Sequence, residues 1–564
     1  MSSKLFTRGG FALPGTSMQF KTGTWRVQRP VHRSLNAPCH CACPAGEDPQ
    51  AYISRLDQGD LRGAWETLVQ ANPLPAVTGR VCPHPCENSC NRGEYDSPLA
   101  IHSIERFLGD RAIAENWAYP VSRPAADAKR VAIIGAGPAG LSCAYHMTRL
   151  GYHATLFTAV PEAGGTLHAI PGYRLPADII NAETQRILDI GIDFKPNHRL
   201  GRDIHLSDLR QEFAAVFIAV GTQLSREWSV GGVTPRDLHV GLNVLKEWMA
   251  VGSVPMSNSV AVIGGGNTSV DLSRIMKRAG IPEVHLITYN GIPGMDTAPE
   301  DMMRAVPREI AQAQEEGIII HTHRGIRRLI LRGERVVGVE MVHMKKMPDQ
   351  QGNLKRVSFE GTETVLHVDQ VIPAIGQIIN PAGLETLLEG KHFLSVEASG
   401  NVTGHDGLFA GGDARANGDG TVTAAVGDGR RAAEAMARYI KAATPPPEID
   451  CTPIRFSQLN THYYEPAPRN EEPTLPVEQR MGEEEIEGSL DHAQVAAEAR
   501  RCFSCGSCMS CDNCWTLCPD SAVLKSVAHA GEDPGYHFDY DYCKGCGLCA
   551  HECPCGYIEM VDDL

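Results

Sequence analysis

Apolar and polar residues alternate in short blocks along the middle of the chain. The apolar runs 131–134 and 260–263 each end in a glycine-rich turn, and an apolar helical pattern follows each turn. Strands that alternate with helices in this way are typical of doubly wound α/β units with parallel sheets. We therefore predict such units over residues 130–445.

The two flanking regions have other patterns. Residues 1–125 show helical periodicity, for example over 51–70. Residues 445–500 are rich in proline and glutamate, as in 445–447 and 483–485. Such a composition favours an extended linker with little core of its own. No apolar run reaches the roughly 18 residues that a membrane span needs, so no membrane segment is expected.

Length and charge narrow the possible functions. A chain of 564 residues exceeds one ordinary domain. Its formal net charge of -15 argues against nucleic acid and against an anionic membrane surface as partners. The first residues lack the apolar core of a signal peptide, so we expect a cytoplasmic protein. In that compartment, 19 cysteines indicate metal or redox use rather than disulfides.

The last part of the chain carries one cysteine pattern twice. Both copies read C-x2-C-x2-C-x3-C-P, and together they contain Cys508, Cys511, Cys514, Cys518, Cys543, Cys546, Cys549 and Cys553. Runs of this form bind two [4Fe-4S] clusters, and the fourth cysteine of each run ligates the other cluster. Zinc is the alternative, but zinc sites usually consist of two separate C-x2-C pairs. The pattern predicts a dicluster ferredoxin domain over 501–564.

Two glycine-rich turns stand where dinucleotide-binding turns are expected. The first contains Gly135, Gly137, Pro138, Ala139 and Gly140, and the second contains Gly264, Gly266, Asn267 and Thr268. Glycines let the backbone approach a pyrophosphate, which then faces the N-terminus of the next helix. Each turn follows a strand and precedes a helix, so a Rossmann-like site is favoured over an empty α/β domain.

Further motifs distinguish the two units. They contain Gly376 at the end of the strand 371–376, Gly412-Asp413, and a helix start with Thr421 and Thr423. These resemble the FAD-closing motifs of the glutathione-reductase-like flavoprotein superfamily. The resemblance implies FAD in residues 126–255 and 371–444, and NAD(P) in residues 256–370.

Residues 35–445 as a whole resemble the glutamate synthase small subunit family, which includes the N-terminal half of dihydropyrimidine dehydrogenase. The resemblance rests on Cys39 and Cys43 in a PC-x3-CPAG string, on Cys82, Cys86 and Cys90 after Gly79-Arg80-Val81, and on 164–176 with Gly165 and Arg174. It implies a helical iron–sulfur domain over 1–125 with two [4Fe-4S] clusters. One cluster is expected on Cys43, Cys82, Cys86 and Cys90.

The second cluster of that domain needs a different source of ligands. Family members have a C-x2-C pair upstream of Cys39, whereas this chain has its surplus pair at Cys502 and Cys505. We hypothesise that this pair folds back to Cys39, with Cys41 or Glu105 as fourth ligand. The alternative is that Cys502 and Cys505 are spare thiols.

The unit with the second turn also differs in sequence from NADPH-dependent relatives. Those relatives carry Tyr-Arg-Arg at the next strand end, where arginine binds the 2′-phosphate. This chain has Tyr289-Asn290-Gly291 there, which favours NAD, although Lys277 or Arg278 could compensate.

These expectations combine into a multidomain α/β electron-transfer subunit without a catalytic acid or base. Electrons are expected to pass between NAD(P)(H), FAD, the N-terminal clusters and the dicluster domain. The C-terminal module resembles the delta subunit of 2-oxoacid:ferredoxin oxidoreductases, which implies such an enzyme, or ferredoxin, as partner. The alternatives are a glutamate synthase small subunit or a free-standing NAD(P)H:ferredoxin oxidoreductase. A disulfide reductase is disfavoured because residues 160–176 contain no cysteine.

Overall fold

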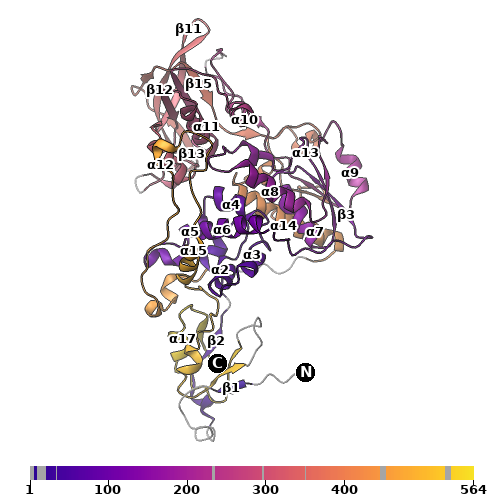
Figure 1. The fold of residues 1–564 in the computed structure, drawn as a ribbon, viewed down its shortest axis with the longest axis vertical. Coiled ribbons are helices and arrows are strands. Elements are labelled where there is room, and N and C mark those ends of the chain that lie inside the picture. The colour runs from indigo at the N-terminus through magenta and orange to yellow at the C-terminus, as the bar shows by residue number, and fades with distance from the viewer. Residues whose placement is uncertain are drawn as a thin grey trace.

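The computed structural model describes residues 6–8, 21–33, 35–230, 235–294, 297–349, 351–444, 452–526 and 535–563. The molecule is elongated (Figure 1). A β-rich unit occupies one end, helices and a parallel sheet form the middle, and the C-terminal module lies at the other end. Within the described ranges, none of the helices has the length and apolarity that crossing a bilayer needs.

The first α/β unit is built on a parallel sheet. Its strand order is β17 (Leu408–Ala410), β6 (Val216–Ile218), β3 (Arg130–Ile134), β4 (His153–Phe157) and β5 (Asp193–Lys195). The helices α7 (Pro138–Arg149) and α14 (Val422–Lys441) pack against each other beside this sheet, with α8 (Ala177–Leu188) and α9 (Leu206–Glu212) around it. Strands β3 and β4 are apolar and almost wholly buried, as strands covered on both faces must be.

The second unit has its own parallel sheet, in the order β10 (Ile319–His321), β9 (Glu283–Ile287), β8 (Ser259–Ile263) and β15 (Gln370–Pro373). Helices α10 (Gly241–Val251), α11 (Asn267–Arg278) and α12 (Pro307–Glu315) accompany it. An antiparallel sheet of β11 (Arg324–Arg332), β12 (Arg335–Pro348), β13 (Leu354–Ser358) and β14 (Thr364–Leu366) extends from this unit. The two parallel sheets confirm the predicted α/β class.

Short helices form the N-terminal domain: α1 (Pro38–Ala42), α2 (Pro49–Asp57), α3 (Leu61–Leu68), α4 (Pro75–Val81), α5 (Pro85–Asn88) and α6 (Ile101–Ala114). Asp48 and Asp60 cap α2 and α3 by accepting hydrogen bonds from backbone N–H groups. The core of this domain is continuous with the first α/β unit, since Trp65, Leu108 and Tyr145 share one apolar cluster. The domain therefore has no separate core.

The first strands of the chain complete the C-terminal module. β2 (Gln28–His32) pairs antiparallel with β20 (Ile558–Asp562), and β1 (Phe6–Arg8) pairs with β18 (Val523–Ser526), which continues to β19 (Tyr536–Phe538). The module also contains α16 (Asn513–Thr516) and α17 (Leu548–His551). The sequence assigned residues 1–125 to one helical domain, but strand pairing joins their first part to the opposite end of the chain.

Residues 465–490, which we call the strap, lie in the predicted linker and follow the surface between the second unit and the N-terminal domain (Figure 1). Ile486 is 2% exposed and belongs to the apolar core of the second unit. Its N–H donates to the Tyr173 carbonyl at 3.0 Å. The strap then leads to α15 (His492–Arg500). Its Ile486 therefore packs into the apolar core of the second unit.

Candidate functional site

The first glycine turn joins β3 to α7. Gly135 has φ +110°, and a Cβ there would lie 2.2 Å from the Ala219 carbonyl oxygen. A Cβ at Gly140 would lie 1.8 Å from the carbonyl oxygen of Gly135, so both positions require glycine. At Gly137, no atom lies within 4 Å of such a Cβ. The tight turn and this open space, followed by Pro138 and Ala139 at the start of α7, fit a pyrophosphate.

Residues from two later segments gather at this turn. A Cβ on Gly165 would lie 2.9 Å from the Gly137 Cα, and one on Gly412 would lie 3.1 Å from the Ala139 Cβ. Beside Gly412, burial and the neighbouring Asp428 raise the pKa of Asp413. The structure therefore brings the predicted FAD residues together around the N-terminus of α7.

The N-terminus of α14 lies at the same place, because Gly412 N donates to Asp428 on this helix at 2.9 Å. Thr421 caps α14 and accepts a hydrogen bond from Ala424 N at 3.2 Å. Thr423 follows on the first turn and is 2% exposed. A helix N-terminus carries partial positive charge, which suits an anionic or electron-rich ligand.

Two of the predicted cofactor residues make contacts within the protein instead of lining the turn. Arg174 is buried and pairs with Asp271 on α11 at 2.8 Å and with Glu309 on α12 at 3.1 Å. These ion pairs fasten the first unit to the second. Gly376 lies where the chain returns from β15 to the first unit, and its carbonyl accepts from Arg226 N at 3.0 Å.

The second glycine turn repeats the first between β8 and α11. A Cβ at Gly264 would lie 2.4 Å from the Ala374 carbonyl oxygen, whereas nothing lies within 4 Å at Gly266. Asn267 Oδ1 accepts a hydrogen bond from Val306 N at 2.9 Å, which fixes this side chain, and Thr268 follows it at the start of α11. The turn thus leaves open space at a helix N-terminus, as a second dinucleotide requires.

Two cavities of the C-terminal module are lined by the predicted ferredoxin cysteines. We call the first group set C, and it consists of Cys508, Cys511, Cys514 and Cys553. Set D consists of Cys518, Cys543, Cys546 and Cys549. Each set takes three cysteines from one run and the fourth from the other, which is the exchange that two-cluster ferredoxins show.

A third cavity lies in the N-terminal domain and is lined by set B, which consists of Cys39, Cys90, Cys502 and Cys505. Asn91 Nδ2 donates to Cys505 Sγ at 3.5 Å. The structure therefore brings the surplus pair to Cys39, as the hypothesis requires. The fourth cysteine is Cys90 rather than either of the candidates that the sequence suggested. Cys41 is disulfide-bonded, and Glu105 lies in another group.

The remaining cysteines of this domain form set A, which consists of Cys43, Cys82, Cys86 and the carboxylate of Glu105. Burial raises the pKa of Cys82 to about 12, and Glu105 acts in the same direction on Cys82 and Cys43. Cys86 in turn lies near Cys82 and Cys43. Asn72 Nδ2 donates to Glu105 Oε1 at 3.0 Å and holds this carboxylate in place. Set A thus has three thiols and one buried carboxylate.

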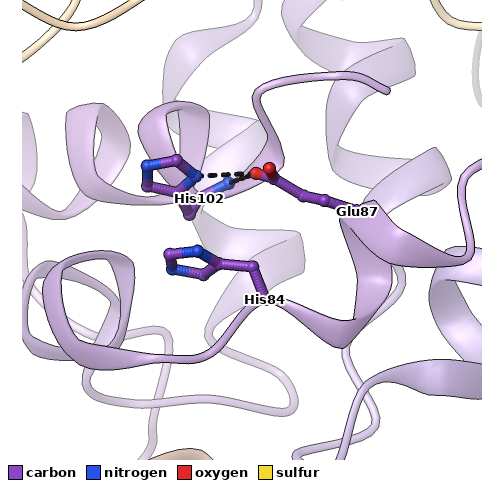
Figure 2. Close-up of side chains that lie close together, drawn as sticks. All are labelled: His84, Glu87 and His102. Atoms are coloured by element: carbon purple, nitrogen blue, oxygen red, sulfur yellow. Dashed lines mark hydrogen bonds and ion pairs between the residues drawn. The ribbon is translucent and has the colours of Figure 1, made fainter. Parts of the chain in front are cut away.

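Figure 2 shows a further buried group, which no sequence spacing indicated. His102 Nδ1 lies 2.7 Å from Glu87, its Nε2 lies 2.7 Å from Glu472 on the strap, and its ring stacks on His84 at 3.9 Å. The residues resemble a metal site in composition. However, both nitrogens of His102 already face carboxylates, and the Arg469 guanidinium lies 2.7 Å from Glu87. A cation would compete with this arginine, so the group is an ion-pair network.

Electrostatic interactions within that network shift the pKa values of His102 and Glu472. Burial lowers the pKa of His102, but Glu87 and Glu472 outweigh it and raise the pKa above its usual value. Burial raises the pKa of Glu472, yet its bonds to His102 and Ser103 lower it to about 2. The network therefore holds a cationic imidazole between two carboxylates and ties the strap to the domain that contains sets A and B.

Comparison with known proteins identifies the family of this chain. Residues 129–429 match the family described as pyridine nucleotide-disulphide oxidoreductase. The chain belongs to this family. Residues 26–117 also match dihydropyrimidine dehydrogenase domain II, 4Fe-4S cluster. These two matches support FAD, NAD(P) and a [4Fe-4S] cluster as cofactors of this oxidoreductase.

Several relatives align with most of this oxidoreductase. The NADP(+)-dependent formate dehydrogenase subunit beta of Moorella thermoacetica is 35% identical, over 84% of this chain and 71% of that protein. The NADPH-Fe(3+) oxidoreductase subunit beta of Geobacter sulfurreducens is 32% identical, over 84% of this chain and 76% of that protein. The glutamate synthase [NADPH] small chain of Escherichia coli is 31% identical, over 75% of this chain and 93% of that protein. They confirm the resemblance to the glutamate synthase small subunit and the prediction of an NAD(P)-dependent FAD/iron–sulfur oxidoreductase.

Proposed function

We propose that the protein is the electron-transfer subunit of a larger oxidoreductase, with four [4Fe-4S] clusters between a dinucleotide end and a partner enzyme. Its first unit binds FAD at the Gly135–Gly140 turn, and its second unit binds NAD(P) at the Gly264–Thr268 turn. The observations that carry this proposal are the packing of the FAD site on set A and the contact between sets B and C. When bound, these groups supply hydride transfer and single-electron transfer.

The FAD site and set A share one helix. Arg431 of α14 donates to the Pro44 carbonyl at 3.0 Å, next to Cys43 of set A. At the N-terminal end of α14, the Thr423 side chain lowers the pKa of Cys82, which burial raises. The helix that faces the flavin site at its N-terminus therefore packs directly on the first cysteine set. This contact supports electron passage at this step.

Sets B and C meet at one short stretch of chain. Gly506 N, next to Cys505 of set B, donates to the Cys555 carbonyl at 2.8 Å, close to Cys553 of set C. Tyr464 lies between them, because its ring packs on Phe503 at 4.6 Å and its hydroxyl approaches Met509 Sδ at 3.4 Å. These contacts link set B to set C.

The donor atoms fit the proposed clusters. Thiolates are the usual ligands of [4Fe-4S] clusters, and sets B, C and D each offer four of them. In set A we assign the fourth position to the Glu105 carboxylate. Set A, with its carboxylate, differs in ligand chemistry from the other three.

Sets C and D lie at the end of the molecule away from the second unit (Figure 1), where a partner enzyme has access. The relatives named above include subunits of a formate dehydrogenase and of an NADPH-Fe(3+) oxidoreductase, which supports a partner subunit for this chain. A 2-oxoacid oxidoreductase is the partner that the C-terminal module suggests. A cytoplasmic location and the absence of a nucleic-acid partner stay predictions.

The test is anaerobic purification of the full chain with its partners. We expect bound FAD, about sixteen iron atoms per chain, and bleaching of the iron–sulfur absorbance on addition of NADH or NADPH. Co-purified subunits would name the partner enzyme. A preparation that holds iron and flavin but is not reduced by either dinucleotide would contradict the proposal. A chain that purifies alone and reduces only ferredoxin would favour a free-standing NAD(P)H:ferredoxin oxidoreductase.

A further inference from the structure

The second unit lacks an acid where NAD is usually recognised. The residues after β9 are Thr288, Tyr289 and Asn290. In dinucleotide folds this strand end faces the adenosine ribose, where an acid binds the 2′-hydroxyl of NAD and an arginine accommodates the 2′-phosphate of NADP. Neither residue type is present in the strand end itself, so any selectivity must come from neighbouring elements.

The start of β11 is joined directly to this strand end. Arg324 N donates to the Thr288 carbonyl at 2.9 Å, and His323 N donates to the Asn290 carbonyl at 3.2 Å. The Arg324 guanidinium lies 3.0 Å from His343 Nδ1 on β12. Burial lowers the pKa of His343, and the positive charges of Arg324, His323 and Lys345 lower it further. The Arg324 guanidinium and the neutral imidazole of His343, with Lys345 nearby, thus lie on the strands that adjoin this strand end.

A second arginine reaches the strand end from β13. The guanidinium carbon of Arg356 lies 3.4 Å from the centroid of the Tyr289 ring. Such stacking holds the guanidinium by a cation–π interaction and leaves its N–H groups free to donate. Tyr289 therefore restrains Arg356 next to the position that the family fills with arginines of the strand end.

These cations lack the carboxylate partners that their neighbours have. On the same sheet and its β12–β13 hairpin, Arg327, Arg328 and Lys355 pair with Glu363, Glu340 and Asp349. Among the described residues, Arg324, Lys345 and Arg356 form no ion pair with a carboxylate. Unpaired like charges repel one another, so a group of them is stabilised by an anion.

We propose that Arg324 and Arg356, with Lys345 and His343 beside them, bind the 2′-phosphate of NADP(H). The proposal rests on the proposed function of the second unit as the NAD(P) site. Guanidinium groups bind phosphate through paired hydrogen bonds. The site replaces the two arginines that the strand end lacks, and it reverses the preference for NAD that the strand end alone suggested.

A binding measurement tests the site without any redox chemistry. The full-length holoprotein is titrated by calorimetry with 2′,5′-ADP and with 5′-AMP, which differ only in the 2′-phosphate. We expect 2′,5′-ADP to bind more tightly, by about tenfold or more. R324Q and R356Q should each remove most of this difference and leave the binding of 5′-AMP unchanged. R335Q, at the exposed turn between β11 and β12, is the matched control and should leave both affinities unchanged.

Three results would overturn the inference: equal binding of the two ligands to the unmodified protein, equal weakening of both ligands by R324Q and R356Q, or the same loss in R335Q. Arg356 is exposed, so R356Q should fold even if R324Q does not. Kinetics provide a second readout, in which KM for NADPH rises in R356Q while KM for NADH does not. If neither dinucleotide reduces the protein, the proposed function fails, yet the 2′,5′-ADP titration still decides this inference.

Discussion

The C-terminal module and the N-terminal domain each contain two sets of candidate cluster ligands, but the chain assembles these sets differently. Sets C and D come from one stretch of chain between Cys508 and Cys553. Set B joins Cys39 and Cys90 to Cys502 and Cys505, which lie more than four hundred residues further along the chain. Local runs bring their own ligands together, whereas set B depends on the tertiary fold.

The contacts that close the N-terminal domain are mostly buried ion pairs from the strap. Arg80 is 4% exposed in its side chain and pairs with Asp110 at 2.6 Å and with Glu485 of the strap at 2.7 Å. Glu472 of the strap pairs with His102. The C-terminal module is attached by strand pairing and by exposed pairs such as Arg33–Glu559.

The largest effect is expected from removing the distant half of set B. The double variant C502S/C505S should lose about four iron atoms per chain, the content of one [4Fe-4S] cluster, and one set of cluster signals in electron paramagnetic resonance. Sets C and D should keep theirs because they do not need the returning chain. C143S is the control, since Cys143 is buried against Met436 and belongs to no set. Unchanged iron in the double variant would show that the pair is not a ligand.

The sequence and the structure assign Cys90 to different sets of the N-terminal domain. Because Cys90 lines the cavity of set B, C90S should remove the same spectroscopic signal as C502S/C505S. C86S should remove a different one, that of set A. The measurement is a comparison of the reduced spectra of these variants. If C90S and C86S lose the same signal, the grouping inferred from the sequence is correct and the one inferred from the structure is not.

The sequence could predict those parts of the site whose ligands lie close together along the chain. The two ferredoxin runs and both glycine turns were recognised because each motif is contiguous and its spacing carries its geometry. Cys82, Cys86 and Cys90 were grouped because the resemblance to the glutamate synthase small subunit family implied one cluster on them and Cys43. In the structure Cys82 precedes the short helix α5 and lies near Glu105, and Cys86 lies within α5, whereas Cys90 lies beyond this helix toward Asn91 and Cys505.

The strap and the first strands were missed for a related reason. The glutamates at 483–485 show no helical or strand periodicity, so the sequence indicated only an extended linker. Their role comes from cations on other elements, such as Arg80 and Arg106 beside Glu485. Likewise, β2 has no partner nearby in sequence and pairs with β20 at the far end of the chain.

Breaking the strap contact should weaken the N-terminal domain. In R80M, Asp110 and Glu485 keep Arg106 as a partner but lose the Arg80 guanidinium. Hydrogen bonds to charged groups contribute about 1.5–3 kcal/mol, so we expect a loss of this size, which is smaller than that of an uncompensated buried charge. R111A is the control, because the Arg111–Glu115 pair is 45% and 41% exposed and such pairs contribute about 0.2–1 kcal/mol. Denaturant unfolding followed by tryptophan fluorescence measures both. Equal destabilisation by the two variants would contradict a structural role for the strap.

Acid should weaken the ion pair between the strap and the N-terminal domain. The folded-state pKa of Glu472 is about 2, below its ordinary value of 4.5. The pair with His102 thus contributes stability above pH 4.5 that is lost as the pH falls toward 2, by roughly 3 kcal/mol in total. E472Q should flatten the stability curve in this window. E471Q removes the exposed neighbouring glutamate and should leave the stability curve unchanged. If the curve of E472Q stays steep between pH 4.5 and 2, other groups cause the pH dependence.

The smallest effect is expected at the attachment of the C-terminal module. Arg33 and Glu559 are 44% and 42% exposed, and their 2.6 Å pair spans β2 and β20. Exposed pairs are screened by salt and cost side-chain entropy, so R33A should lower the free energy of unfolding by about 1 kcal/mol or less. The five-residue backbone register between the strands does not depend on this side chain. Its effect should vanish in high salt, whereas that of R80M should persist, since buried pairs are little screened. A salt-independent loss in R33A would place the two attachments in the same class.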